Sequence, residues 1–364
     1  MLYVLIFLAS TATAMLATIA VRRVALVLRA VDVPGVPRKI HAKPTPLLGG
    51  LAVFLSFWAV IGSITLFTDV LPARYVSAQF LGGLFAAGLA LMVGGFLDDR
   101  YRLRARFQLA APAIAILVVI GSGMGIVFVS NPLGAGLWHL DALQWQLFEF
   151  RGRAATFVLL ADVFTVIWLL GMMFTTKLLD GLDGLVSGIT TIGAFILFAL
   201  SLSDKTFQPD VALLAVSLAG AAAGFLFWNA HPARIFLGEG GSVWLGFMLG
   251  VLAIISGGKV ATALLVMGVP ILDVGWVIVR RVFLEKRSPA IGDSKHLHFR
   301  LLTAGLSHRA SVLLLWGLAA LFGVASLFVQ TQGKMYLLAA LVCIMILLGL
   351  WSRKRSHSLA SPLS

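Results

Sequence analysis

The chain of 364 residues is poor in cysteine and in charge. Its one cysteine, Cys343, excludes an internal disulfide and any metal site built from several cysteines. Charged residues make up 12% of the chain, about half their share in an average soluble domain, whereas 60% of the residues are hydrophobic. Together with a mean hydropathy of +1.00, this composition excludes a soluble globular protein, a disordered chain and a disulfide-stapled scaffold.

Acidic residues are scarce relative to basic ones: 15 Asp and Glu stand against 28 Lys and Arg, a net charge of +13. Such a balance is typical of nucleic-acid binding, but basic residues that flank membrane spans produce the same excess. Apolar runs of spanning length fill most of the chain, so the sequence favours a membrane protein without nucleic acid as a partner.

Long apolar runs dominate the sequence. A helix needs about 20 mostly apolar residues to cross the hydrocarbon core, and its backbone must be hydrogen-bonded internally. The sequence predicts an all-α integral membrane protein, a polytopic bundle of about 11 transmembrane helices in a single domain, 1–364. The expected spans are 1–21, 47–67, 78–97, 109–129, 157–176, 184–203, 211–228, 240–257, 260–280, 311–330 and 335–351.

The first run also has a small-residue pattern, Ala12-Thr13-Ala14, that resembles a signal-peptide cleavage site. No basic residue precedes it, and Arg22 and Arg23 follow it, which favours a retained membrane anchor. When the loops are assigned alternately to the two sides, most Lys and Arg residues fall on one side. The positive-inside rule makes that side cytoplasmic, with the N-terminus outside and the C-terminus cytoplasmic. The segment 130–156 is expected to lie at the outer interface.

Two acidic pairs lie at cytoplasmic ends of predicted spans. Asp98 and Asp99 end the third span. They are either a charged stop or a functional pair whose mutual repulsion a metal or a shared proton relieves. Lys177, Asp180 and Asp183 follow the fifth span at a spacing that places them near one helix face. The carboxylate oxygens of Asp180 and Asp183 suit Mg²⁺ or Mn²⁺ as ligands. The alternative to a metal site is a structural ion pair of Lys177 with one aspartate.

Further polar segments fall on the same side. The basic turn 38–50 contains Lys43, and the segment 229–242 combines an amide, an aromatic ring and an acid with glycines. Asp273 lies within the ninth span. The segment 293–300 carries His296, His298 and Arg300. Taken alone, such a histidine pair is more often solvated than catalytic. Groups that suit phosphates and groups that suit a metal nevertheless gather on one face.

With these residues in view, the chain resembles the polyprenyl-phosphate N-acetylhexosamine-1-phosphate transferases, glycosyltransferase family 4. The resemblance covers about residues 30–310. It rests on five motifs in order, which are 41–50, Asp98-Asp99, Asp180-Gly-Leu-Asp183-Gly, Asn229-x-x-Pro-Ala-x-x-Phe236-x-Gly238, and the histidine loop 296–300.

The resemblance implies a reaction: a UDP-activated amino sugar donates its sugar-1-phosphate to undecaprenyl phosphate and releases UMP, at the cytoplasmic face of the bacterial inner membrane. It implies Mg²⁺, with Mn²⁺ as an alternative, and is compatible with a homodimer. It also implies residue roles: Asp98 and Asp99 near the acceptor phosphate, Asp180 and Asp183 near metal and nucleotide, Glu239 as metal ligand, Asn229 and Phe236 on the uracil, Lys43 on the donor, and His296, His298 and Arg300 on diphosphate and sugar.

Three positions depart from the family pattern. Lys177 replaces the usual asparagine, Glu239 the usual aspartate, and Phe299 the usual histidine. Lys177 is expected either to weaken metal binding or to take over a phosphate contact. Phe299 is expected to alter sugar preference, and a catalytically inactive member remains an alternative.

Within the family, Pro44-Thr45-Pro46 and the His-Leu-His-Phe-Arg loop favour GlcNAc-1-phosphate as the transferred group. The alternative is a phospho-MurNAc-pentapeptide transferase of peptidoglycan synthesis. Outside the enzyme class, the alternatives are a secondary transporter, which predicts charges near the bilayer midplane and repeated halves, and a non-catalytic scaffold that binds undecaprenyl phosphate.

Overall fold

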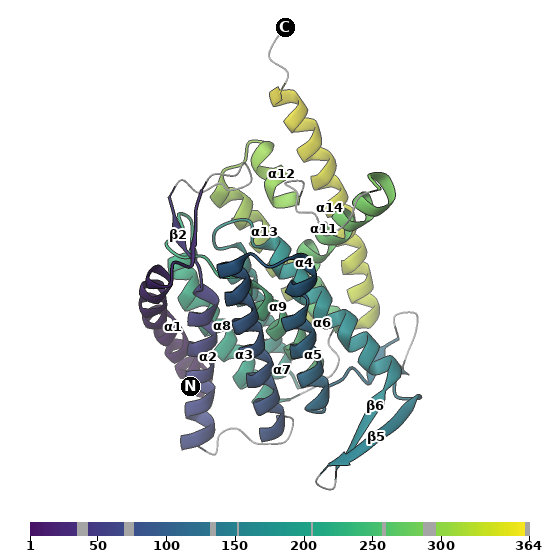
Figure 1. The fold of residues 1–364 in the computed structure, drawn as a ribbon. Helices are drawn as coiled ribbons and strands as arrows, with labels where there is room; N and C mark the ends of the chain where they lie inside the picture. Colours follow the sequence, from purple (N-terminus) through teal and green to yellow (C-terminus); the bar gives the residue numbers. More distant parts are fainter. Residues whose placement is uncertain are drawn as a thin grey trace.

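Apolar helices make up most of the computed structural model, which describes residues 1–34, 43–68, 76–131, 136–150, 153–204, 207–256, 260–286 and 296–360 (Figure 1). The helices are α1 (Leu2–Val27), α2 (Gly49–Phe67), α3 (Ala78–Tyr101), α4 (Ala105–Gln108), α5 (Ala110–Gly121), α6 (Leu159–Leu179), α7 (Leu185–Ser201), α8 (Pro209–Asn229), α9 (Gly238–Ile255), α10 (Val260–Val266), α11 (Gly268–Val279), the π-helical turn η1 (Arg280–Leu284), α12 (Leu297–Thr303), α13 (His308–Phe328) and α14 (Thr331–Ala360).

Three small antiparallel hairpins complete the described fold. The first pairs β1 (Val31–Asp32) with β2 (Thr45–Pro46) beside the start of α2. The other two pair β3 (Phe128–Ser130) with β4 (Leu137–His139), and β5 (Gln144–Phe150) with β6 (Arg153–Val158). Figure 1 shows β5 and β6 at one end of the bundle, and β2, α4, α12 and the C-terminus at the other. The segment predicted as an outer interfacial stretch is therefore a pair of hairpins.

Eight described helices are long and apolar enough to cross a membrane, or nine if a bent helix pair forms one span. The protein is therefore a multi-pass membrane protein, as predicted. Two shorter apolar helical segments, Ala105–Gly121 and Leu185–Ser201, correspond to the fourth and sixth predicted spans.

Two predicted spans differ from the structure. The run 260–280 is broken: α10 and the helix that follows it are bent by 81°, and in Figure 1 α11 leaves the bundle sideways. Gly268 and Pro270 lie at the break, where proline removes a backbone donor and disfavours a continuous helix. The run 109–129 is helical only to Gly121. Gly123 then takes a φ of +93°, a left-handed conformation that glycine adopts readily, and the chain turns into β3.

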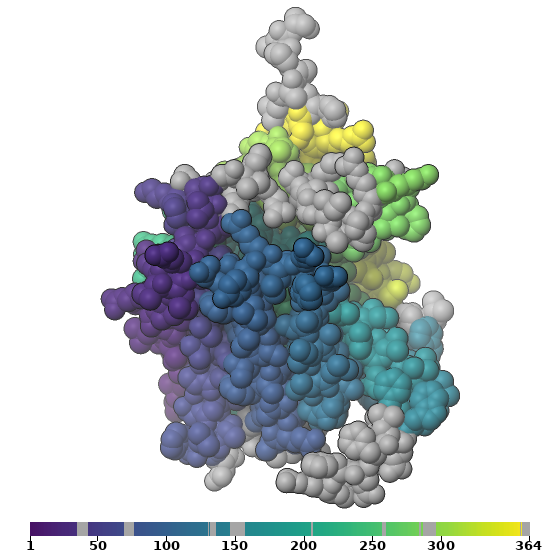
Figure 2. Space-filling model, in the orientation of Figure 1, coloured from purple at the N-terminus to yellow at the C-terminus, as the bar shows by residue number. Residues whose placement is uncertain are grey.

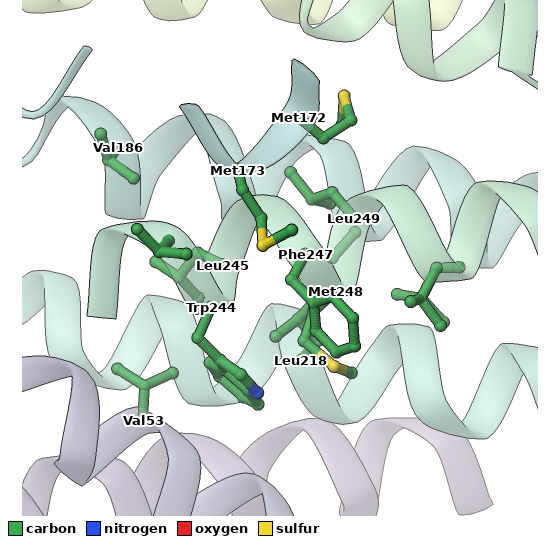
Figure 3. Packing of buried hydrophobic residues seen from close by; sticks show 14 of the residues in the cluster. Val53, Met172, Met173, Val186, Leu218, Trp244, Leu245, Phe247, Met248 and Leu249 are labelled. Atoms are coloured by element: carbon green, nitrogen blue, oxygen red, sulfur yellow. The ribbon is translucent and has the colours of Figure 1, made fainter. Parts of the chain in front are cut away.

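Helix α9 lies at the centre of the bundle, with 89% of its apolar segment buried. Trp244 and Phe247 of α9 are fully buried among the core residues that Figure 3 shows, and the Trp244 ring packs against Phe54 and Phe57 of α2, with centroids 5.5 and 5.7 Å apart. Glycines bring the neighbouring helices close: a Cβ built on Gly95 of α3 would lie 2.1 Å from the Cα of Gly240. Small residues permit such approach between membrane helices. This packing fixes the N-terminus of α9 beside the end of α3, where the acidic motifs meet.

Candidate active site

A cavity of about 850 Å³ opens at the end of the bundle where α3 and α6 finish and α9 begins. All the residues predicted for the site line it, except those of the histidine loop: Lys43, Asp98, Asp99, Lys177, Asp180, Asp183, Asn229, Phe236 and Glu239. With Asp32, which the sequence did not single out, the structure brings carboxylates from four chain segments, distant in sequence, into one pocket. The motif residues 38–42 and 293–295 lie outside the described residues.

Asp99 joins the end of α3 to the start of α9. Both of its carboxylate oxygens accept from the backbone amide of Glu239, at 3.2 and 3.1 Å. The first turn of a helix has unpaired amides and a positive end, so a carboxylate there is favourable. Gly238 has a φ of +73°, and a Cβ on it would lie 2.5 Å from Asp99 Oδ2. Glycine is therefore required where Asp99 meets α9.

A hydrogen-bonded chain crosses the pocket from Asp98 to Glu239. Asp98 Oδ1 accepts from the amide of Leu103 at 2.8 Å and from Gln108 Nε2 at 3.1 Å. The other end of Gln108 accepts from Lys177 Nζ at 2.8 Å. The Lys177 ammonium also forms an ion pair with Glu239. Lys177 therefore pairs with Glu239, whereas the ion pair that the sequence offered as an alternative was with one of the aspartates.

Asp180 caps the C-terminal end of α6, and its side chain is exposed to the open pocket. Protein surrounds that pocket on its other sides. Desolvation, followed by the negative charges of Glu239, Asp99 and Asp183, raises the pKa of the Asp180 carboxyl above its usual range. A cation near Asp180 would relieve this repulsion.

Asp183 is held by groups that the sequence did not single out. Its Oδ2 lies 2.7 Å from His231 Nδ1 and accepts from the amide of Ala233 at 3.1 Å. The ring of His308 stacks on His231, with centroids 4.0 Å apart. Asp183, His231 and His308 offer ligand atoms that all lie within 4.8 Å of one another. No regular spacing links these histidines to Asp183, so only the fold reveals the cluster.

Asn229 is buried at the back of the pocket, and its amide binds protein. Its Oδ1 accepts from the amide of Gly184 at 3.1 Å and from Ser187 Oγ at 2.8 Å. Its Nδ2 donates to the carbonyl of Ile235 at 3.0 Å. The predicted contact with uracil would require it to give up at least one of these bonds. In this structure Asn229 locks the aspartate turn against the end of α8.

The predicted residues of the histidine loop do not line the pocket. His296 Nδ1 lies 2.9 Å from Asp273 Oδ2, and Asp273 Oδ1 accepts from the amide of Leu297 at 2.8 Å, which fixes the start of α12. Arg300 donates to the carbonyl of Gly349 in α14. The loop residue that faces the pocket is Phe299, the one that departs from the family pattern.

His298 is 1% exposed and abuts the turn between the two aspartates: a Cβ on Gly181 would lie 2.4 Å from its Nε2. Burial lowers the pKa of the His298 imidazole to about 4, against the opposing charge of Asp273. Among the described residues, neither of its ring nitrogens has a hydrogen-bond partner. His298 is therefore a neutral ring that buttresses the aspartate turn.

A second, apolar cavity of about 670 Å³ adjoins the pocket. It runs between α3 and α5, which lie side by side in Figure 1 and belong to the blue face of Figure 2. Its apolar lining includes Ala90, Val93 and Ile114. It shares Asp98, Leu103, Gln108 and Glu239 with the acidic pocket. The charged pocket therefore continues into a groove of membrane-like character.

Comparison with known proteins identifies the family. Residues 81–257 match the family model described as glycosyl transferase family 4. A probable undecaprenyl-phosphate N-acetylglucosaminyl 1-phosphate transferase of Bacillus subtilis is 31% identical over 336 residues, 90% of this chain and 85% of that protein. A decaprenyl-phosphate N-acetylglucosaminephosphotransferase of Mycolicibacterium smegmatis is 34% identical over 82% of this chain and 75% of its own. A phospho-N-acetylmuramoyl-pentapeptide-transferase of Desulforamulus reducens is 29% identical over 78% of this chain and 81% of its own. The chain therefore belongs to glycosyl transferase family 4, the family that its motifs resemble.

Proposed function

We propose that the protein transfers GlcNAc-1-phosphate from UDP-GlcNAc to undecaprenyl phosphate, the initiating step of a cell-envelope glycan. The observation that carries this proposal is the junction of the two cavities. Asp98, Gln108 and Glu239 line both the acidic pocket and the apolar groove. A phosphate on a polyprenyl chain needs such a junction, because its headgroup is charged and its tail is apolar.

In the proposed reaction, an oxygen of the acceptor phosphate attacks the phosphorus that carries the sugar. A new P–O–P bond forms, the bond to the bridging oxygen of UDP breaks, and UMP leaves with the bonding electron pair. Asp98 and Asp99 are the proposed acceptor-side carboxylates, since they end α3 beside the groove. Phe236 and Lys43, which also line the pocket, are the proposed contacts of the nucleotide.

The pocket fits a divalent cation. Its carboxylate oxygens are donors that Mg²⁺ prefers and Mn²⁺ also accepts, and His231 and His308 offer nitrogen donors beside Asp183. The motifs assign the ion to Asp183 and Glu239, and Asp180 faces the same space. Bound there, such a cation would offset the charge that accumulates when two phosphates approach each other. Asp180 and Asp183 would in addition orient the nucleotide-side oxygens.

We assign a supporting role to His296, His298 and Arg300, which the motifs place on diphosphate and sugar. The side chains of these three residues contact other parts of the protein, whereas Phe299 of the same loop lines the pocket. The structure favours a loop that presents Phe299 to the donor sugar, held in place by Asp273 through His296. An apolar ring at that position suits the face or the N-acetyl methyl of a sugar.

We also propose an orientation in the bacterial plasma membrane. The sequence predicts eleven spans in one domain, 1–364; eight described helices and one bent pair are long and apolar enough to cross a membrane, and we propose that the two shorter apolar segments complete the set. The charge distribution places the N-terminus outside and the C-terminus in the cytoplasm. In Figure 1 the C-terminus lies at the same end of the bundle as α4 and α12, and the pocket opens where α3 and α6 finish and α9 begins. The active site would then face the cytoplasm, where UDP-sugars occur.

The deciding experiment incubates purified protein with Mg²⁺, undecaprenyl phosphate and a panel of UDP-sugars and measures UMP. Release of UMP with UDP-GlcNAc and not with UDP-MurNAc-pentapeptide is the expected result. The reverse preference would support the pentapeptide branch, and no UMP from any donor would exclude the transferase. Asp98→Asn and Asp183→Asn should each lose most turnover, whereas Asp204→Asn, at an exposed site between α7 and α8, should retain it.

A further inference from the structure

Lys177 brings a permanent positive charge into the acidic pocket. It stands in the last turn of α6, and its side chain is 18% exposed. Its ammonium forms an ion pair with Glu239, whose side chain is 20% exposed, and donates to Gln108 Oε1 at 2.8 Å. The ammonium also lies 5.6 Å from the centroid of the Phe174 ring. Gln108 and Phe174 therefore help to hold the ammonium beside Glu239.

The Glu239 carboxylate faces two positive partners: Lys177 and the divalent cation of the proposed function. Two cations that share one carboxylate repel each other, and this repulsion is strong in a partly desolvated pocket. The Lys177 ammonium is tethered to the chain, so its effective concentration beside Glu239 exceeds that of any free ion. Glu239 is therefore neutralised before a metal ion arrives.

We propose that Lys177 is a resident cation that neutralises Glu239 and lowers the affinity of the pocket for divalent metal ions. The metal ion is then held by Asp180 and the neighbouring aspartates, and Glu239 is the ion-pair partner of Lys177 instead of a metal ligand. This inference rests on the cation of the proposed function and reassigns one of its ligands. A pocket built in this way is neutral on its Glu239 side whether or not a metal ion is bound.

The alternative is that Glu239 itself coordinates the metal ion, with Lys177 as a bystander. The two arrangements differ in what happens when both charges are removed. If the pair is neutral as a unit, its joint removal leaves the field at the metal ion nearly unchanged. If Glu239 is a ligand, its loss weakens binding whether Lys177 is present or absent.

The experiment measures Mn²⁺ binding by electron paramagnetic resonance on purified protein without nucleotide or lipid. Lys177→Asn should bind Mn²⁺ at least tenfold more tightly than the natural protein, and Glu239→Gln at least tenfold more weakly. Lys177→Asn combined with Glu239→Gln should return to within about threefold of the natural protein. Lys177→Arg, which keeps the charge, should change the dissociation constant by less than about threefold.

A double variant that binds as weakly as Glu239→Gln would overturn the proposal, as would Lys177→Asn with unchanged Mn²⁺ affinity. Lys177→Asn leaves Glu239 unpaired and is the variant that risks misfolding. The double variant carries neither charge and decides the matter by itself. The UMP assay tests the transferase separately. If Lys177→Asn binds Mn²⁺ tightly but the natural protein releases no UMP, the role of Lys177 as a resident cation is supported and the proposed transferase activity is rejected.

Discussion

His231 Nδ1 lies 2.7 Å from Asp183 Oδ2, and the ring of His308 stacks on His231. Asp183 Oδ2 also accepts from the amide of Ala233 at 3.1 Å, so two groups hold this oxygen in place. His231 stands at an unspecified position of the motif 229–238, so it is the contact with Asp183 that identifies it as a positioning residue for the aspartate turn.

Replacement of His231 tests this contact. His231→Phe keeps a ring for His308 to stack on and removes the hydrogen bond to Asp183. A hydrogen bond to a charged group contributes about 1.5–3 kcal/mol, so kcat should fall about tenfold to a hundredfold. The KM for UDP-GlcNAc should change less than kcat, since Phe236 and Lys43, the proposed contacts of the nucleotide, are unaltered. An unchanged kcat with normal folding would remove His231 from the site.

The apolar groove predicts a dependence on acceptor chain length. Ala90 of α3 lines the groove, so Ala90→Trp fills part of it without touching the acidic pocket. The KM for undecaprenyl phosphate should rise at least fivefold, while geranyl phosphate, whose chain is short, should react unchanged. Leu117→Trp is the matched control, because Leu117 of α5 is 67% exposed and does not line the groove. Equal effects of Ala90→Trp on both acceptors would place the polyprenyl chain elsewhere.

The lengths of apolar runs and the motifs predicted most of the membrane helices and most of the pocket, because both depend on local patterns. Apolar runs locate membrane helices, and Asp98, Asp180 and Asp183 lie at their ends. The break at Gly268 escaped prediction, since α10 and α11 are both apolar and only their packing reveals the bend. The roles of His231 and Gln108 escaped it too, because each binds a partner from a segment distant in sequence. Side-chain direction in the histidine loop likewise depends on Asp273 of another helix.

Two glycines of α3, Gly95 and Gly82, should differ sharply in how their replacement by alanine changes the stability of the protein. A Cβ on Gly95 would lie 2.1 Å from the backbone of Gly240, whereas a Cβ on Gly82 meets nothing within 4 Å. Gly95→Ala should destabilise the protein by about 1–3 kcal/mol or more, because backbone cannot move aside as a flexible side chain does. Gly82→Ala should stabilise it by up to about 1 kcal/mol through helix propensity. Thermal unfolding in detergent measures both changes. Equal midpoints for the two variants would contradict the close packing of α3 on α9.

Because His298 is buried as a neutral ring, the folded protein should lose stability as the pH is lowered below neutrality. Burial holds the pKa of His298 at about 4 in the folded protein, against about 6.5 in the unfolded chain. Between these values the unfolded state binds a proton that the folded state does not, so the free energy of unfolding falls as pH falls through this window.

From pH 7.5 to pH 5.0 the loss attributable to His298 should be about 2 kcal/mol. His298→Gln cannot titrate, so its unfolding midpoint should fall less than that of the natural protein over the same range. His139→Gln serves as the control, because the side chain of His139 is 65% exposed and lies in β4, away from the site. Its midpoint should fall as far as that of the natural protein. If His298→Gln shows the full pH dependence, His298 is not the buried neutral ring that buttresses Gly181, and the aspartate turn must be held by other groups.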